Sequence, residues 1–434
     1  MLGDPQTRAS ADFLPWGNVL ATRAPRPIHD GLKNRHVNKG LVWENDAVRL
    51  VVTEAGPGQA YLVASTKWGA DAASASQAAY NEIGRVLQDQ GLVIVHERLF
   101  GSLTVKPTVI ASRSAAFRAR NLPADGPLTY VQGHPPGGEG LAGVIIRAVS
   151  CCHPQDKVWT IMDRGKPVGR GWRREETAFL LLQNIQGLAL GPPPVNAPLL
   201  QAKRMIQRAA EILESQGASY CDVIRTWFYL ADILGWYPEF NRARTAIYGR
   251  FGILPGPGNG RLKLPASTGI RGELATGAAG ALDLLAVVGP PDSRLLVKQL
   301  SNPGQQDAFR YGSAFSRGAL IHQSNLSLIQ VSGTAAIDEQ GQSLYAGDVR
   351  AQIDCTFDKI DALIDQEGAA LCDIAAACVF VKRPEDALVY QERIAARGLE
   401  HLPTVIMVAD VCREELLFEM DAEVAFDPSM KVCS

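Results

Sequence analysis

Two acidic residues share one face of a predicted strand near the C-terminus. In the segment ELLFEMDAE, Glu419 and Asp421 alternate with Phe418 and Met420. Successive side chains of a strand point to opposite faces, so the two carboxyl groups lie on the same side. A carboxylic acid in a poorly solvated pocket has a raised pKa and can donate a proton. The pattern fits such an acid, but by itself it more often marks the solvated acidic face of an edge strand.

Several arginines are candidates for binding the carboxylates of a small substrate, since a guanidinium pairs with a carboxylate through two hydrogen bonds. Arg225 lies in a strand-like run beside Trp227 and Tyr229, where a cation must be paired or face a pocket. Arg242 and Arg244 lie on a predicted helix, where surface ion pairs are the ordinary alternative. The other candidates are Arg310, Arg317 and Arg413.

Metal and nucleotide motifs are not found. The eight cysteines form no CxxC pair and most lie in apolar stretches, which is typical of reduced thiols in a cytosolic protein. The histidines lack the H-x₃-H spacing of a metal-binding helix. The Gly-rich segments match neither a phosphate-binding loop nor a nucleophile elbow. We therefore expect no metal and no cofactor.

The composition is that of a globular protein. The 434 residues include 43 Lys and Arg against 45 Asp and Glu, a net charge of −2, which argues against a nucleic-acid partner or an anionic membrane surface. No apolar run of about 18 residues and no secretory signal is present, so we expect no membrane span and a cytoplasmic location. The length suggests two or three domains.

A helix followed by a strand recurs three times. Each predicted helix ends at a glycine that suits the left-handed position after a helix C-terminus, namely Gly91, Gly217 and Gly368. In the second and third copies the glycine precedes an Ala, a Cys-Asp pair and a β-rich run. A strand is predicted at 48–55 and a helix at 71–90. The later copies add second helices (236–250, 384–398), closing strands (278–288, 404–411, 416–426) and strand pairs (128–163, 317–338).

These elements predict an α/β fold of the α+β kind, with mixed sheets covered by helices. We assign residues 1–45 to an irregular N-terminal arm, 46–125 to a divergent module, 126–292 to a second module and 293–434 to a C-terminal module. An isolated module would leave one face uncovered, so we expect the three to pack as an internal pseudo-trimer. Whether the chain is monomeric or forms a homo-oligomer stays open.

The module order resembles the RidA/YjgF family, whose members form trimers with small-molecule sites between subunits. The C-terminal module carries the clearest motifs, VSGTAAID and LLFEMDAEVA. Modules two and three together are similar to the chorismatase branch, through IRTWFYL, YPEFNRARTA, LPASTGI, SNPGQQDAFRYG, VFVKRPED and ADVCREELLFEMD. The resemblance implies conversion of chorismate to pyruvate and a hydroxybenzoate without a cofactor.

The resemblance also implies roles for individual residues. Glu419 falls at the position of the acid. Cys412 and Gly333 fit the pattern of forms that make 3-hydroxybenzoate, although Cys412 also suits a small core position. The implied substrate-binding residues are Arg225, Arg242, Arg310, Tyr311, Arg317, Gly333 and Thr268. Arg310 and Tyr311 fall in a lid loop. Thr268 offers a hydroxyl, or belongs to a plain turn.

Departures from the pattern keep other functions open. Tyr345 stands in the turn 337–348 where chorismatases carry a His, and the loop 309–318 is short and lacks the expected prolines. RidA deaminases carry an Arg after the proline of a late strand, whereas Thr404 follows Pro403 here. That argues against a standard deaminase. A lyase or deaminase acting on another small carboxylate, and a non-catalytic ligand-binding protein, remain alternatives.

Overall fold

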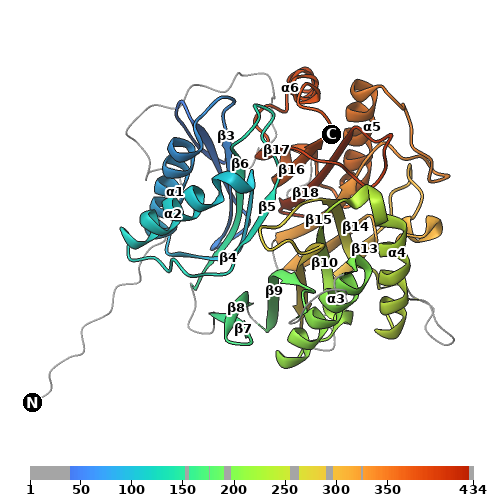
Figure 1. Cartoon of the computed structure of the whole chain (residues 1–434), viewed down its shortest axis with the longest axis horizontal. Coiled ribbons are helices and arrows are strands. Elements are labelled where there is room, and N and C mark those ends of the chain that lie inside the picture. The colour runs from blue at the N-terminus through green and yellow to red at the C-terminus, as the bar shows by residue number, and fades with distance from the viewer. Residues whose placement is uncertain are drawn as a thin grey trace, which may run out of the picture. The chain divides into compact units, whose positions relative to one another are not determined.

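Three mixed β-sheets, each accompanied by helices, make up the described part of this computed structural model (Figure 1). The structure describes residues 40–151, 156–174, 176–189, 197–254, 263–289, 297–323 and 326–429. Within these residues each sheet has six strands in the same relative order, with one parallel pair at one edge. The α+β class and the trimer-like repeat are therefore confirmed.

The first module spans residues 41–150. Its elements are β1 (Leu41–Glu44), β2 (Val48–Glu54), β3 (Gln59–Thr66), α1 (Ala72–Asp89), β4 (Leu92–Gly101), the short η2 (Leu103–Val105), α2 (Lys106–Arg118), β5 (Thr129–Gln132) and β6 (Leu141–Ser150). Asp71 caps α1 by accepting a hydrogen bond from the Ser74 N–H, and Gly91 follows the helix at a φ of 59°.

The second module spans residues 157–288. It contains β7 (Lys157–Asp163), β8 (Lys166–Arg174), β9 (Thr177–Gln186), α3 (Pro198–Ser215), η3 (Tyr220–Asp222), β10 (Val223–Leu230), α4 (Ile233–Arg250), β11 (Ala266–Arg271) and β12 (Gly280–Val288). Gly217 follows α3 at a φ of 75°, as the sequence predicts.

The third module spans residues 297–426. It contains β13 (Val297–Leu300), η5 (Ala308–Tyr311), β14 (Gly318–Gln323), β15 (Leu326–Thr334), α5 (Val349–Asp365), η6 (Leu371–Asp373), β16 (Ile374–Val381), α6 (Asp386–Ala396), β17 (Thr404–Val408) and β18 (Phe418–Phe426). Gly368 lies after α5 at a φ of 83°.

Two predicted boundaries are wrong. Strands β5 and β6 pair with β4 and β3, so the first module extends to residue 150 instead of ending at 125. A strand pattern does not reveal which neighbouring sheet a strand joins, because the pairing depends on residues far away in the chain. Residues 41–44 form β1 and are not part of an irregular arm, while residues 1–39 lie outside the described residues.

The inner faces of the three sheets share one apolar core. Side chains from every module meet there, among them Val63, Val95, Trp172, Phe179, Leu328 and Val405. Strand β4 contacts β8 and β9, β11 contacts β15, and β17 contacts β3 and β6. The helices cover the opposite faces, where further cores form in the second and third modules (Figure 1). Each module thus contacts both of the others.

Equivalent positions in the three modules can be identified from strand register. A register irregularity near the start of β4, β10 and β16 recurs at Val95, Ile224 and Ala375. Counting from it, Arg98 in the first module corresponds to Trp227 in the second and Cys378 in the third. Their antiparallel neighbours are Ile145, Asp283 and Asp421, respectively. This alignment allows the three module interfaces to be compared residue by residue.

Candidate functional site

Glu419 lies where the second and third modules meet. It is on β18 and only 4% exposed, and its Oε1 faces the backbone of Gly333 on β15. A Cβ added at Gly333 would lie 2.2 Å from that oxygen, so any other residue would force the carboxyl group to move. Burial and the charge of Asp421 raise the pKa of Glu419 to about 8, although Arg317 and Arg225 act to lower it. The carboxyl group is thus predominantly protonated at neutral pH.

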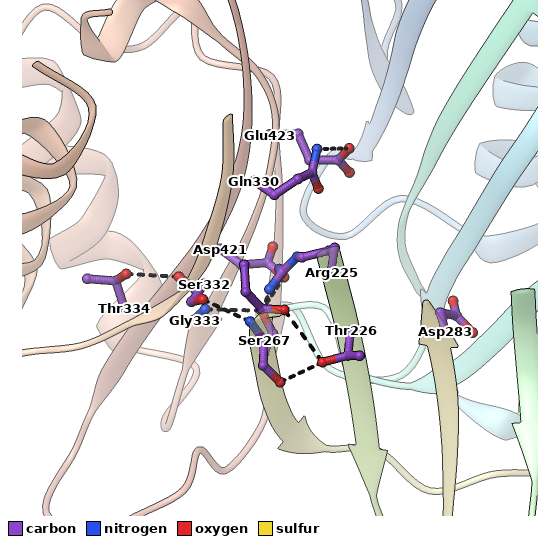
Figure 2. Close-up of polar contacts among 12 residues, drawn as sticks. Arg225, Thr226, Ser267, Asp283, Gln330, Ser332, Gly333, Thr334, Asp421 and Glu423 are labelled. Atoms are coloured by element: carbon purple, nitrogen blue, oxygen red, sulfur yellow. Dashed lines mark hydrogen bonds and ion pairs between the residues drawn. The ribbon is translucent and has the colours of Figure 1, made fainter. Parts of the chain in front are cut away.

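A buried polar network surrounds Asp421, two residues along β18 from this acid, and Figure 2 shows Arg225, Asp421 and Gly333 within it. Arg225 Nη2 donates to Asp421 Oδ2 at 3.0 Å and to Thr268 Oγ1 at 2.6 Å. The Thr268 hydroxyl donates to Asp421 at 2.9 Å and accepts from the Gly333 N–H at 3.1 Å. Thr268 therefore links Asp421 to the backbone of Gly333, which the Glu419 carboxyl group faces. Within the described residues, the fully buried Nε and Nη1 of Arg225 have no hydrogen-bond partner.

A second group of side chains near Glu419 includes Arg317, Tyr311 and Cys412. Arg317 is buried just before β14 and donates from Nη2 to the Tyr311 hydroxyl at 2.7 Å. Cys412, in the loop between β17 and β18, is close enough to Glu419 and Arg317 to feel their charges. Burial, reinforced by Glu419, raises the pKa of the Cys412 thiol to about 12, despite Arg413 and Arg317. Cys412 is thus a neutral thiol and not a thiolate nucleophile.

Helix α4 separates two arginines that are adjacent candidates in the sequence. The Arg242 side chain is 70% exposed and paired with Glu239 at 2.6 Å. Arg244 is 1% exposed, donates to Asn241 at 2.7 Å and lies within 3.5 Å of Ser267 Oγ. Residues two apart on a helix differ by about 200° in direction. The structure therefore does not bring Arg242 into the site, and Arg244 is the arginine that α4 contributes.

Tyr237 is a site residue that the sequence analysis missed. Burial raises the pKa of its phenol, whose neighbouring charges include Cys412, Tyr311 and Glu419. Tyr237, Phe240 and Arg244 are spaced i, i+3 and i+7 on α4, which places them on one helix face. That spacing is the sequence feature from which Tyr237 could have been predicted to lie on the same helix face as Arg244. It was obscured by Pro238 and by the non-helical backbone at Trp236, which break the regular pattern.

Two further positions lie at the surface. Arg310 is exposed on η5, whereas its neighbour Tyr311 turns inward to Arg317. The short 3₁₀ turn directs consecutive side chains to different sides, so Arg310 does not join the cluster. Tyr345 is 52% exposed at a φ of 54°. The short loop 309–318 instead contributes Phe315, against which both Arg244 and Arg317 stack.

The other two module interfaces differ in their polar groups. Between the first and second modules, Asp283 Oδ1 accepts from Thr129 Oγ1 at 2.7 Å, and its Oδ2 lies 3.1 Å from His96 Nε2. This triad is equivalent by register to Asp421, Thr268 and Arg225. The third interface has Ile145, Val405 and Ala376 at these places.

At the position of Glu419 the other modules carry Ala281 and Gly143. Only one of the three equivalent positions therefore supplies an acid.

Comparisons with known proteins agree with this architecture. Residues 308–426 match the family model of endoribonuclease L-PSP. A chorismatase of Streptomyces rapamycinicus is 27% identical over 232 residues, covering 48% of this chain and 65% of the relative. A chorismatase of Streptomyces hygroscopicus is 24% identical over 234 residues, covering 49% and 64%. The chain thus spans slightly less than two thirds of the length of these curated relatives.

A solved chorismatase structure matches with a TM-score of 0.55 at 19% identity, covering 76% of this chain and 92% of that chain. This match shows that the fold is shared. In its C-terminal module the chain is similar to the endoribonuclease L-PSP family. Over about half of its length it is similar to chorismatases, with which it shares the fold. None of its helices in the described residues is long and apolar enough to cross a membrane.

Proposed function

We propose that the protein converts chorismate into pyruvate and a hydroxybenzoate, with 3-hydroxybenzoate as the expected isomer. The observation that supports this most directly is a buried carboxyl group, Glu419, whose pKa is raised to about 8 beside buried arginines. An acid that keeps its proton at neutral pH is suited to general acid catalysis. The chorismatase relatives supply the substrate class. A cytoplasmic location remains a prediction.

Glu419 would donate its proton to the methylene carbon of the enolpyruvyl group. The bond between the ring and the ether oxygen then breaks, its electron pair stays on the oxygen, and pyruvate leaves. The ring loses one proton as it becomes aromatic, which balances the proton supplied. The two products together hold all the atoms of chorismate. For the 3-hydroxy isomer the ring oxygen must also move to the neighbouring carbon, and we assign the pocket shape that permits this to Cys412 and Gly333.

The two carboxylates of chorismate need cations. Arg317 and Arg244 are our candidates because both are buried, stack on Phe315 and lie near Tyr311 or Tyr237. Arg225 already has Asp421 as a partner, so we assign it the role of anchoring that carboxylate. Its free Nε and Nη1 are the groups with which it would also reach a substrate oxygen.

The test is to incubate the purified protein with chorismate and to follow pyruvate and the aromatic product by chromatography. We expect equimolar pyruvate and 3-hydroxybenzoate, and loss of both in Glu419→Gln, which keeps the shape but cannot donate the same proton. Chorismate left intact by the parent protein would refute the proposed substrate. Full turnover by Glu419→Gln would remove Glu419 from the chemistry.

A further inference from the structure

Arg98 on β4 brings a cation of the first module to the acidic strand β18. Arg98 is 2% exposed. Its Nη2 donates to Glu423 Oε1 at 3.2 Å, and its Nη1 lies 3.8 Å from Asp421 Oδ2. Both carboxylates belong to β18 of the third module, on the same strand face as Glu419. A cation of the first module thus pairs with the acidic strand that carries the proposed proton donor.

The surroundings of Arg98 hold it in this place. Its guanidinium lies over the Trp227 ring at 4.9 Å, and Arg225 lies over the same ring at 4.5 Å. Cys378 pairs directly with Asp421, and its small side chain occupies the position equivalent to Arg98 and Trp227. A larger residue there would crowd the approach to Asp421. The small side chain of Cys378 therefore leaves room for Arg98 to reach Asp421.

The charges around Glu419 come from several elements. Asp421 and Glu423 lie on its own strand, Arg225 on β10, Arg317 before β14, Cys412 in the β17–β18 loop and Tyr237 on α4. Burial by itself would raise the pKa of Glu423, but Arg98, Arg147 and His96 hold it below its usual range. Glu423 is therefore ionised, and Arg98 is the cation that contacts both it and Asp421.

We propose that Arg98 is a positioning residue of the Glu419 site: it fixes Asp421 and Glu423 as paired carboxylates and thereby limits the negative charge that Glu419 experiences. This rests on the proposed function only in calling Glu419 the acid. It gives the first module a task beyond packing, because the first module contributes none of the residues grouped around Glu419 above. Arg98 itself does not act on the substrate.

The test is to measure the titration of Glu419 in the full chain, through the protonated-carboxyl infrared band that Glu419→Gln removes. Arg98→Met should move the midpoint upward by about one pH unit, because the cation that pairs with Asp421 and Glu423, on the same strand face as the acid, is lost from a low-dielectric environment. Arg98→Lys keeps a charge and should move it less. If Arg98→Met does not fold, Arg98→Gln gives the same comparison while it can still hydrogen-bond Glu423.

Arg113→Met is the matched control. Arg113 is a buried arginine of the same module, paired at 2.7 Å with Glu97, which lies on the other face of β4. The Arg113→Met substitution removes a comparable ion pair and should leave the titration midpoint of Glu419 unchanged. An unchanged midpoint in Arg98→Met, an equal shift in Arg113→Met, or no band lost in Glu419→Gln would overturn the proposal. The band needs no turnover, so a parent protein inactive on chorismate refutes the proposed function without deciding the role of Arg98.

Discussion

At the scale of residues, the environment of Glu419 distinguishes it from an ordinary surface carboxylate. Alternation along β18 gives it the same face as Asp421 and Glu423, yet the pKa of Glu419 is raised and that of Glu423 is lowered. Glu423 has a close cation in Arg98, whereas Glu419 lies against the Gly333 backbone. Contact with a guanidinium favours the ionised form of Glu423, whereas burial and the charge of Asp421 outweigh Arg317 and Arg225 and favour the neutral form of Glu419. One strand thus presents both a fixed charge and a candidate acid.

The stability of the protein should depend on the proton of Glu419. Its folded pKa of about 8 lies above the unfolded value, so the folded state binds more protons between about pH 4.5 and pH 8. This contribution is complete below the unfolded pKa and is lost as the pH rises through the folded pKa. The parent should lose about 2–4 kcal/mol of unfolding free energy over this range relative to Glu419→Gln. Urea unfolding of both proteins at the two ends of this pH range measures the difference. If the unfolding free energies of the parent and of Glu419→Gln changed by the same amount, the prediction would be wrong.

Gly333→Ala should lower the activity strongly while the fold is kept. The new methyl group would lie 2.2 Å from Glu419 Oε1 and 3.3 Å from the Thr268 methyl, so the carboxyl group must move away. Misplacing an acid by about an ångström typically costs around 100-fold in rate. We expect kcat/KM to fall at least that far, with an unchanged circular dichroism spectrum. Near-parental activity would show that the Glu419 carboxyl is not held where the structure places it.

At the scale of elements, helix α4 decides which arginine serves the site. Its buried face carries Phe240 and Arg244 toward β10 and β11, while Arg242 points to solvent beside Glu239. Conversely, the positions of Thr268 and Gly333 follow from the contact of β11 with β15. The site therefore depends on the meeting of several strands and a helix, and not on one sequence motif.

Arg244→Ala and Arg242→Ala form a matched pair that tests this assignment. Arg244→Ala should lower kcat/KM at least about 30-fold, the usual cost of losing a buried arginine that pairs with a ligand carboxylate. Arg242→Ala should change it less than about twofold, because an exposed ion pair contributes little. Steady-state kinetics with chorismate gives both values. Equal effects of the two substitutions would contradict the placement of α4.

At the scale of the whole molecule, one chain builds three similar interfaces and equips them differently. The interface of the second and third modules carries the acid, that of the first and second keeps the His96, Thr129 and Asp283 triad, and the third is apolar at the equivalent places. A homotrimer of identical chains must have three identical interfaces. Joining the modules in one chain permits this division of roles.

A chain that begins at residue 156, without the first module, should self-associate. The shared core would lose Val63, Val95 and Ile145, and would expose the apolar residues of β17 that contact β3 and β6. Large exposed apolar patches drive association. Light scattering should show aggregates or oligomers for the shortened chain alone. A stable monomer would mean that the first module is not needed to cover this core.

The sequence by itself determined the features that depend on neighbouring residues. The glycines at 91, 217 and 368 mark the helix ends, and alternation along β18 puts Glu419 and Asp421 on one face. Only the tertiary structure decided the assignment of β5 and β6 to the first sheet, the choice of Arg244 over Arg242, and the ion pair of Arg98 with Glu423, 325 residues away. Caps and alternation act within a few residues, whereas sheet pairing and cross-module contacts depend on distant partners whose identity no local pattern contains.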